Sequence, residues 1–196
     1  MRPTLKLFAL LLISASALLL QGCFPLAATG IGAAALMVDD RRSTGVYVED
    51  ENIEWKARGR LIESFRDAHV NVTSFNLTVL VTGEVPSEQM KRQVGDAIRA
   101  IASVKNVNNE LVVGGNSALT ARANDGFITT GVKTRFINNG KFSINHVKVV
   151  TEAGTAFLMG IVSREEGDAA TELARTTSGV SRVVKVFEYL EQSPRR

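Results

Sequence analysis

An internal repeat constrains the fold of this chain more than any other feature of its sequence. The segment 72–85 aligns with 149–162 at an offset of 77 residues, which places Gly83 on Gly160. Apolar positions before and after these segments match at offsets of 75 and 76, so the two copies differ by short insertions in loops. A fixed period of this kind indicates one supersecondary unit built twice. We therefore predict two tandem domains, at 46–113 and 123–191, joined by a linker at 114–122.

Each copy contains the same order of predicted elements. Apolar residues four apart predict a first helix at 53–61 and again at 128–136. A valine-rich hairpin follows it, then a second helix that begins near Pro86 or Ser163, and then a last strand. The predicted last strands are 107–113 and 183–189. The order helix, strand, strand, helix, strand predicts an α+β fold in which two helices cover a three-stranded mixed sheet.

Three short signals refine this prediction. Gly83 and Gly160 end the second strand of each copy, where a glycine permits positive φ or close approach of the backbone. We interpret both as structural glycines. Ser163 and Glu166 have the spacing of a capping box, which predicts a helix start at this point.

The N-terminal residues have the pattern of a secretory leader. Arg2 and Lys6 precede an apolar run at 7–20, which is shorter than the ~20 residues needed to span a bilayer. The run ends in Leu20-Gln21-Gly22-Cys23, which resembles the bacterial lipobox. That resemblance implies that residues 1–22 are a cleaved signal peptide and that Cys23 carries acyl chains such as palmitate. Residues 23–45 are rich in Ala and Gly and then polar, and we predict a flexible tether there.

The two copies differ in net charge. Without the leader the chain carries 21 basic and 20 acidic side chains, which argues against nucleic acid as a partner. The first copy, 46–113, has a net charge of −2, whereas residues 121–196 carry +3, of which Arg195 and Arg196 supply two. The second copy is therefore the better partner for an anionic surface.

The hairpin sequences carry a family resemblance. Leu-Val-Thr-Gly-Glu-Val at 80–85 and Leu-Met-Gly-Ile-Val at 158–162, each between two helices, resemble the BON domain. With the lipobox, the whole chain is similar to the dual-BON outer-membrane lipoproteins. The resemblance implies a protein without catalytic activity that binds anionic phospholipid, such as phosphatidylglycerol, through its second domain and supports outer-membrane integrity. It also implies an outer-membrane protein that faces the periplasm, because Phe24, and not Asp, follows Cys23.

The first helix of the second copy offers candidate lipid-binding residues. Phe127 lies about 100° around the helix from the inward-facing Ile128, so we expect it to be exposed. An exposed aromatic ring can enter the headgroup region while neighbouring cations meet phosphates. The predicted lipid-binding residues are Phe127, Gly131, Lys133, Thr134 and Arg135. The alternative is that Phe127 packs on the neighbouring repeat or on the start of its own helix.

Other residues leave a second function open. Trp55 lies off the inward face of its helix and is expected to plug the contact between the repeats or, alternatively, to bind a protein. A scaffold for outer-membrane assembly or division machinery is thus the alternative function. His69 and His146 precede corresponding strands, and we expect satisfied loop histidines. We find no nucleophile, paired carboxylates, metal cluster or phosphate loop in the sequence, so we expect no enzyme, metal or cofactor.

Overall fold

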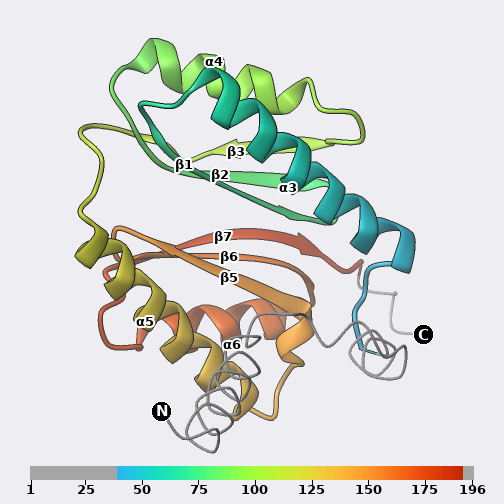
Figure 1. Cartoon of the computed structure of the whole chain (residues 1–196). Helices are drawn as coiled ribbons and strands as arrows, with labels where there is room; N and C mark the ends of the chain where they lie inside the picture. The colour runs from blue at the N-terminus through green and yellow to red at the C-terminus, as the bar shows by residue number, and fades with distance from the viewer. Residues whose placement is uncertain (1–38, 192–196) are drawn as a thin grey trace, which may run out of the picture. The chain divides into compact units, whose positions relative to one another are not determined.

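The computed structural model describes residues 39–191 (Figure 1). The predicted signal peptide, Cys23, most of the predicted tether and the tail at 192–196 lie outside the described residues. The first domain contains α3 (Thr44–Ser64), β1 (His69–Phe75), β2 (Thr78–Val85), α4 (Glu88–Arg99), β3 (Asn106–Asn109) and β4 (Val112–Val113). The second contains α5 (Leu119–Ile137), the 3-10 turn η2 (Ile144–His146), β5 (Val147–Glu152), β6 (Thr155–Val162), α6 (Arg164–Arg175) and β7 (Arg182–Tyr189). Within the described part of the chain, no helix combines the length and apolar character needed to cross a bilayer.

Each domain is a mixed sheet with two helices on one face. β1 pairs antiparallel with β2, and β2 pairs parallel with β3 and β4. In the second domain β5 pairs antiparallel with β6, and β6 pairs parallel with β7. Figure 1 shows α3 and α4 together over the first sheet, and α5 and α6 together over the second. The predicted α+β fold of two tandem units is therefore confirmed.

The last strand of the first domain differs from its prediction. The sequence predicts one strand at 107–113, but the structure contains β3 and β4 with a gap between them. The gap lies beside Gly83 of β2, whose φ of 115° is unusual for a strand. Gly160 of β6 is not among the positive-φ residues, and β7 beside it runs without interruption. The parallel ladder is therefore interrupted beside Gly83 in the first domain and continuous beside Gly160 in the second.

Both hairpins turn through two residues in the left-handed region. The φ values are 52° and 65° at Asn76 and Leu77, and 47° and 71° at Ala153 and Gly154. Positive φ at both central positions is the geometry of a type I′ turn, which matches the twist of the flanking strands. Leu77 is an unfavourable residue for this conformation, so other contacts must hold the turn.

A buried aspartate supplies those contacts in each domain. The Asp50 carboxylate of α3 accepts hydrogen bonds from the amides of Asn76 and Leu77, both at 2.8 Å. Asp125 of α5 accepts from the corresponding amides of the second hairpin, both at 2.9 Å. Each first helix is therefore fastened to the tip of its own hairpin. This repeated feature was not predicted from the sequence.

The two sheets share a small apolar cluster in addition to their separate cores. Along β2, Val79 and Val81 face the helices of the first domain, whereas Leu80 points to the opposite face. This alternation follows from the period of a strand. Leu80 and Phe75 pack with Phe157 and Met159 of β6. The faces of the two sheets that carry no helix therefore contact each other.

The described end of the predicted tether, residues 39–45, contacts both domains. The Arg41 guanidinium binds both carboxylate oxygens of Glu166, at 2.7 and 2.8 Å. Arg42 donates to Asp50 at 2.9 Å, and α3 begins at Thr44, before the predicted domain start at 46. The predicted tether is therefore too long at its C-terminal end. Its polar composition is typical of a linker, and the sequence alone does not show that Arg41 has a partner 125 residues away.

Candidate functional site

Helix α5 carries the predicted lipid-binding residues. It packs Ile128, Val132 and Phe136 into the core of the second domain, while 76% of the Phe127 side chain is exposed. The expected exposure of Phe127 is confirmed, and the alternative that it packs on the other repeat is wrong. Lys133 and Thr134 are exposed as well. These three side chains are accessible on one helix.

Arg135 and Gly131, in contrast, lie against the C-terminal end of α6. The Arg135 Nη1 atom donates to the carbonyl of Leu173 at 2.7 Å and to the hydroxyl of Thr176 at 2.8 Å. It therefore caps the C-terminal end of α6, where positive charge is favourable. A Cβ on Gly131 would lie 3.3 Å from Thr177, so this glycine permits close packing beside the same helix end. Lys133 remains as the exposed cation of the predicted set.

Two further apolar side chains are exposed on α5 and were not predicted. Leu119 is 79% and Ile137 65% exposed. They are 18 residues apart, which is five helical turns, so they lie on one line along about 27 Å of helix. That spacing was visible in the sequence and could have identified them. Phe127 lies about 80° around the helix from that line. We call the three exposed apolar side chains of α5 the α5 stripe: Leu119, Phe127 and Ile137.

Helix α3 carries a second exposed stripe. Val48, Trp55 and Ile62 recur seven residues apart and are 51%, 77% and 58% exposed. The expectation that Trp55 plugs the contact between the repeats is wrong, because that contact is made by the sheets. We call these three residues the α3 stripe.

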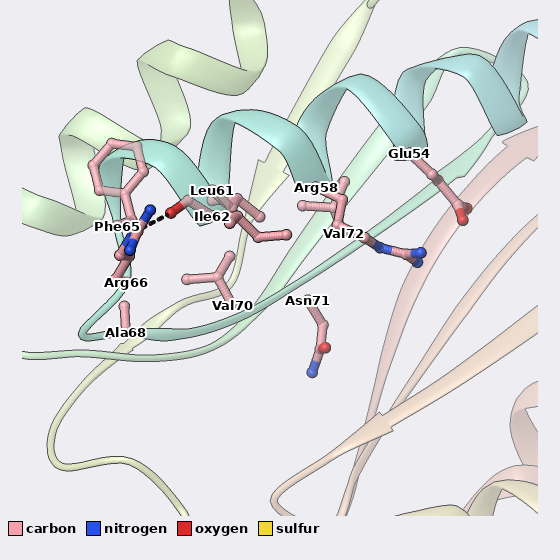
Figure 2. Close-up of a pocket in the computed structure, with 10 residues that line it drawn as sticks. All are labelled: Glu54, Arg58, Leu61, Ile62, Phe65, Arg66, Ala68, Val70, Asn71 and Val72. Carbon is pink, nitrogen blue, oxygen red and sulfur yellow. Dashed lines mark hydrogen bonds between the residues drawn. The ribbon is translucent and has the colours of Figure 1, made fainter.

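A cavity of about 450 Å³ lies beside the α3 stripe, between α3 and β1 (Figure 2). In Figure 2, Arg66 donates to the carbonyl of Ile62 near one end of this cavity, and Glu54 and Arg58 lie further along α3. The lining residues are Glu54, Arg58, Leu61, Ile62, Phe65, Arg66, Ala68, Val70, Asn71 and Val72. Its surface therefore combines apolar side chains with charges of both signs.

The two structural glycines occupy equivalent crowded positions. A Cβ built on Gly83 would collide with the carbonyl oxygen of His69, and one on Gly160 would collide with that of His146. In each domain the neighbouring first strand runs directly against the glycine. A side chain at either position would separate the two strands.

His69 lies in a polar cluster that the sequence analysis missed. Its Nδ1 is 2.9 Å from Oε2 of Glu84 and 3.8 Å from Oε1 of Glu152, a residue of the other domain. Burial alone would raise the pKa of Glu84, but hydrogen bonds from His69 and from the amide and hydroxyl of Ser117 lower it. The three side chains are 10–14% exposed. They converge only after folding, so local sequence gave no signal.

His146 occupies the corresponding place in the second domain. Its Nε2 lies 3.4 Å from Oδ1 of Asp39, and its Nδ1 lies 3.6 Å from Oε1 of Glu166. The buried Nδ1 has no hydrogen-bond partner among residues 39–191. The expectation of a fully satisfied loop histidine is therefore wrong for this residue. Its carboxylate neighbour Glu166 is already bound by Arg41.

Comparison with known proteins identifies the fold family and the relatives. The BON domain model matches residues 49–115 and 124–191. The outer membrane lipoprotein DolP of Haemophilus influenzae is 33% identical over 190 residues, which is 95% of this chain and 97% of its own length. A 21 kDa hemolysin of Actinobacillus pleuropneumoniae is 32% identical and covers 78% of this chain and 80% of its own. The osmotically-inducible protein Y of Escherichia coli is 25% identical, over 71% and 72% respectively.

These matches agree with the repeated fold. Both domain matches contain the complete order of two helices and a mixed sheet described above. The similarity to DolP extends over nearly the whole of both chains and supports an outer-membrane lipoprotein. The chain therefore belongs to the BON-domain family, as a DolP-like member with two BON domains.

Proposed function

We propose that this protein is a non-enzymatic, periplasm-facing lipoprotein that binds anionic phospholipid through its second BON domain and supports outer-membrane integrity. The observation that carries the proposal is the α5 stripe, in which Phe127 is 76% exposed. Exposure of a large aromatic ring to water is unfavourable, and its burial at a membrane interface is favourable.

The geometry of α5 suits a shallow contact with headgroups. Phe127 and Ile137 can bury apolar surface at the interface, and Lys133, one helical turn before Ile137, can pair with lipid phosphate. Thr134 is exposed beside Phe127 and offers a hydroxyl oxygen, although its proton is donated to the carbonyl of Thr130. Arg135 is excluded from this role because it caps α6.

The acyl anchor expected at Cys23 would complete the mechanism. One anchor gives modest membrane attachment without headgroup discrimination. A second contact on the same molecule then acts at high effective concentration. Weak binding by α5 would thus suffice to direct an anchored protein to anionic regions of the membrane.

Vesicle flotation tests this function. A soluble form beginning at Phe24, with Cys23 removed, should float with phosphatidylglycerol vesicles and not with phosphatidylcholine vesicles. Phe127→Glu should weaken binding by about 10- to 100-fold, since it removes the burial of one large apolar side chain. Trp55→Glu is the matched control, because it changes an equally exposed aromatic on the equivalent helix. Unchanged binding after Phe127→Glu, or equal loss from both variants, would contradict the assignment.

A protein scaffold is the second candidate function, and the α3 stripe favours it. Trp55 is 77% exposed, and Ile62 of the same stripe lines a cavity with apolar and charged side chains, which are features of a protein contact. A photo-crosslinking residue at position 55 in living cells should then form protein adducts, whereas one at position 127 should form lipid adducts. Adducts to protein at 127 alone would reverse the two assignments.

A further inference from the structure

Three side chains with metal-binding atoms converge between the two BON domains. They are His69 of β1, Glu84 of β2 and Glu152 of β5, and their nearest ligand atoms all lie within 4.8 Å of one another. Ligands of a tetrahedral Zn²⁺ ion are about 3.4 Å apart, because each lies about 2.0–2.2 Å from the metal. Small side-chain rotations would bring this set to that spacing. Two domains thus supply one candidate site.

Neighbouring polar groups hold the two carboxylates in place. Asn71 donates to Oε2 of Glu152 at 2.9 Å, and Thr82 donates to the same oxygen at 3.2 Å. Ser117 donates to Oε2 of Glu84 through both its amide and its hydroxyl, at 3.2 Å. Such supporting contacts orient the ligands in known metal sites. His69 Nδ1 shares a proton with Oε2 of Glu84 at 2.9 Å, and Oε1 of Glu152 lies 3.8 Å from the same nitrogen, so a metal ion would replace that proton.

The cluster has an excess of negative charge. Glu84 and Glu152 are about nine-tenths buried, and His69 is the one basic side chain with a nitrogen within 4.0 Å of either carboxylate in the described part of the chain. Even a protonated imidazole would balance only one of the two charges. Buried charges require a partner, and a divalent cation would neutralise both carboxylates.

A cavity connects the cluster with solvent. It has a volume of about 410 Å³, and His69, Asn71 and Glu152 form part of its wall. Arg122 and Asp125 line the same cavity, and Arg122 donates through Nε to the hydroxyl of Ser117. An ion with its water molecules can therefore reach His69 and Glu152 through this cavity, and Glu84 lies behind His69, 2.9 Å from its Nδ1.

We propose that His69, Glu84 and Glu152 form a binding site for a divalent transition-metal ion, with Zn²⁺ as the preferred ion, that joins the two BON domains. The imidazole favours Zn²⁺ over Mg²⁺ and Ca²⁺, which prefer oxygen ligands alone. Three protein ligands leave a fourth position for water. None of its three ligands is a residue of the lipid contact on α5, although α5 lines part of the cavity that leads to the site.

Calorimetric titration of the full-length mature lipoprotein in detergent, after treatment with a chelator, tests the site. The wild-type protein should bind Zn²⁺ with one ion per chain and should not lose it to excess Mg²⁺. Glu152→Gln and His69→Gln should each weaken Zn²⁺ binding more than about tenfold, since even supporting residues are worth about 10- to 100-fold. Glu188→Gln is the matched control, because Glu188 also accepts a hydrogen bond across the domain contact, from Asn76 at 2.6 Å.

A second measurement separates loss of ligands from loss of folding. Zn²⁺ should raise the melting temperature of the wild type and of Glu188→Gln, but not of Glu152→Gln, whose shape is conserved. If circular dichroism shows Glu152→Gln or His69→Gln to be unfolded, Glu84→Gln replaces that variant in the comparison with the wild type. A wild-type protein that binds no Zn²⁺ overturns the proposal. Equal binding by the wild type and the folded ligand variants overturns it as well, because the ion would then lie elsewhere.

Discussion

Asp50 and Asp125 show how a single side chain can determine the local backbone. Each is almost fully buried, at 1% and 7% exposure, on the first helix of its domain. Each accepts two backbone amides from a turn that needs positive φ at successive residues. Charged acceptors form the stronger class of hydrogen bond, so they can offset the cost of that conformation. Asp50 and Asp125 lie three residues before Ile53 and Ile128. The internal repeat therefore includes these two aspartates as well as the apolar residues of the helices.

Replacement of Asp125 by Asn should destabilise the second domain. The amide keeps one oxygen acceptor but cannot accept from both Ala153 and Gly154 through two charged oxygens. We expect a loss of about 2 kcal/mol in the free energy of unfolding, the range of a hydrogen bond to a charged group. Urea denaturation followed by circular dichroism measures this change.

Asp168→Asn provides the control for that prediction. Asp168 is exposed on α6, so the same chemical change there should alter stability by less than about 0.5 kcal/mol. Equal effects of the two variants would show that Asp125 does not hold the turn.

At the level of helices and strands, apolar periodicity was enough to predict most of the fold. The inward-facing residues of α3 and α5 were identified because helical spacing depends on local sequence alone, and the same phase placed Phe127 outside. The capping box was confirmed, with Ser163 and Glu166 exchanging the two expected hydrogen bonds. Local rules therefore predicted the inward face of α3 and α5 and the start of α6, but not the full length of the first helices, which begin at Thr44 and Leu119.

Features that depend on packing were not predictable in the same way. Gly83 and Gly160 look equivalent in sequence, yet only Gly83 has positive φ and interrupts the neighbouring strand. Arg135 was predicted to contact lipid because its partners, at and just beyond the end of α6, lie 38 to 42 residues further along the chain. The cluster of His69 and Glu152 joins residues of different domains. Each of these outcomes requires knowledge of which surfaces meet.

At the scale of the whole molecule, the described end of the predicted tether, residues 39–45, connects the two domains. Arg42 binds Asp50 on α3, and the adjacent Arg41 binds Glu166 at the start of α6. The Arg41 guanidinium also donates to the carbonyl of Ile161 at 2.8 Å. This segment therefore holds both domains at the point where the chain enters the folded part.

The contact between Arg41 and Glu166 predicts a specific loss of stability in acid. Hydrogen bonds from Arg41 lower the pKa of Glu166 from 4.5 to about 2, with burial opposing this shift and the Ser163 amide supporting it. The unfolded chain binds this proton more readily, so the contribution is complete above pH 4.5 and disappears as the pH falls toward 2. The shift sets an upper limit of about 3 kcal/mol. Because both side chains are partly exposed, we expect about 1–2 kcal/mol.

Comparison of Glu166→Gln with the wild type isolates this contribution. Glutamine can still complete the capping box, so the helix start is retained while the charge is removed. At neutral pH the variant should be less stable than the wild type by the expected amount, and the two urea midpoints should converge between pH 4.5 and 2. Glu165→Gln, a change at the exposed neighbour in the same helical turn, should show no such convergence. A constant difference between Glu166→Gln and the wild type over this range would mean that the ion pair does not stabilise the connection between the N-terminal segment and the second domain.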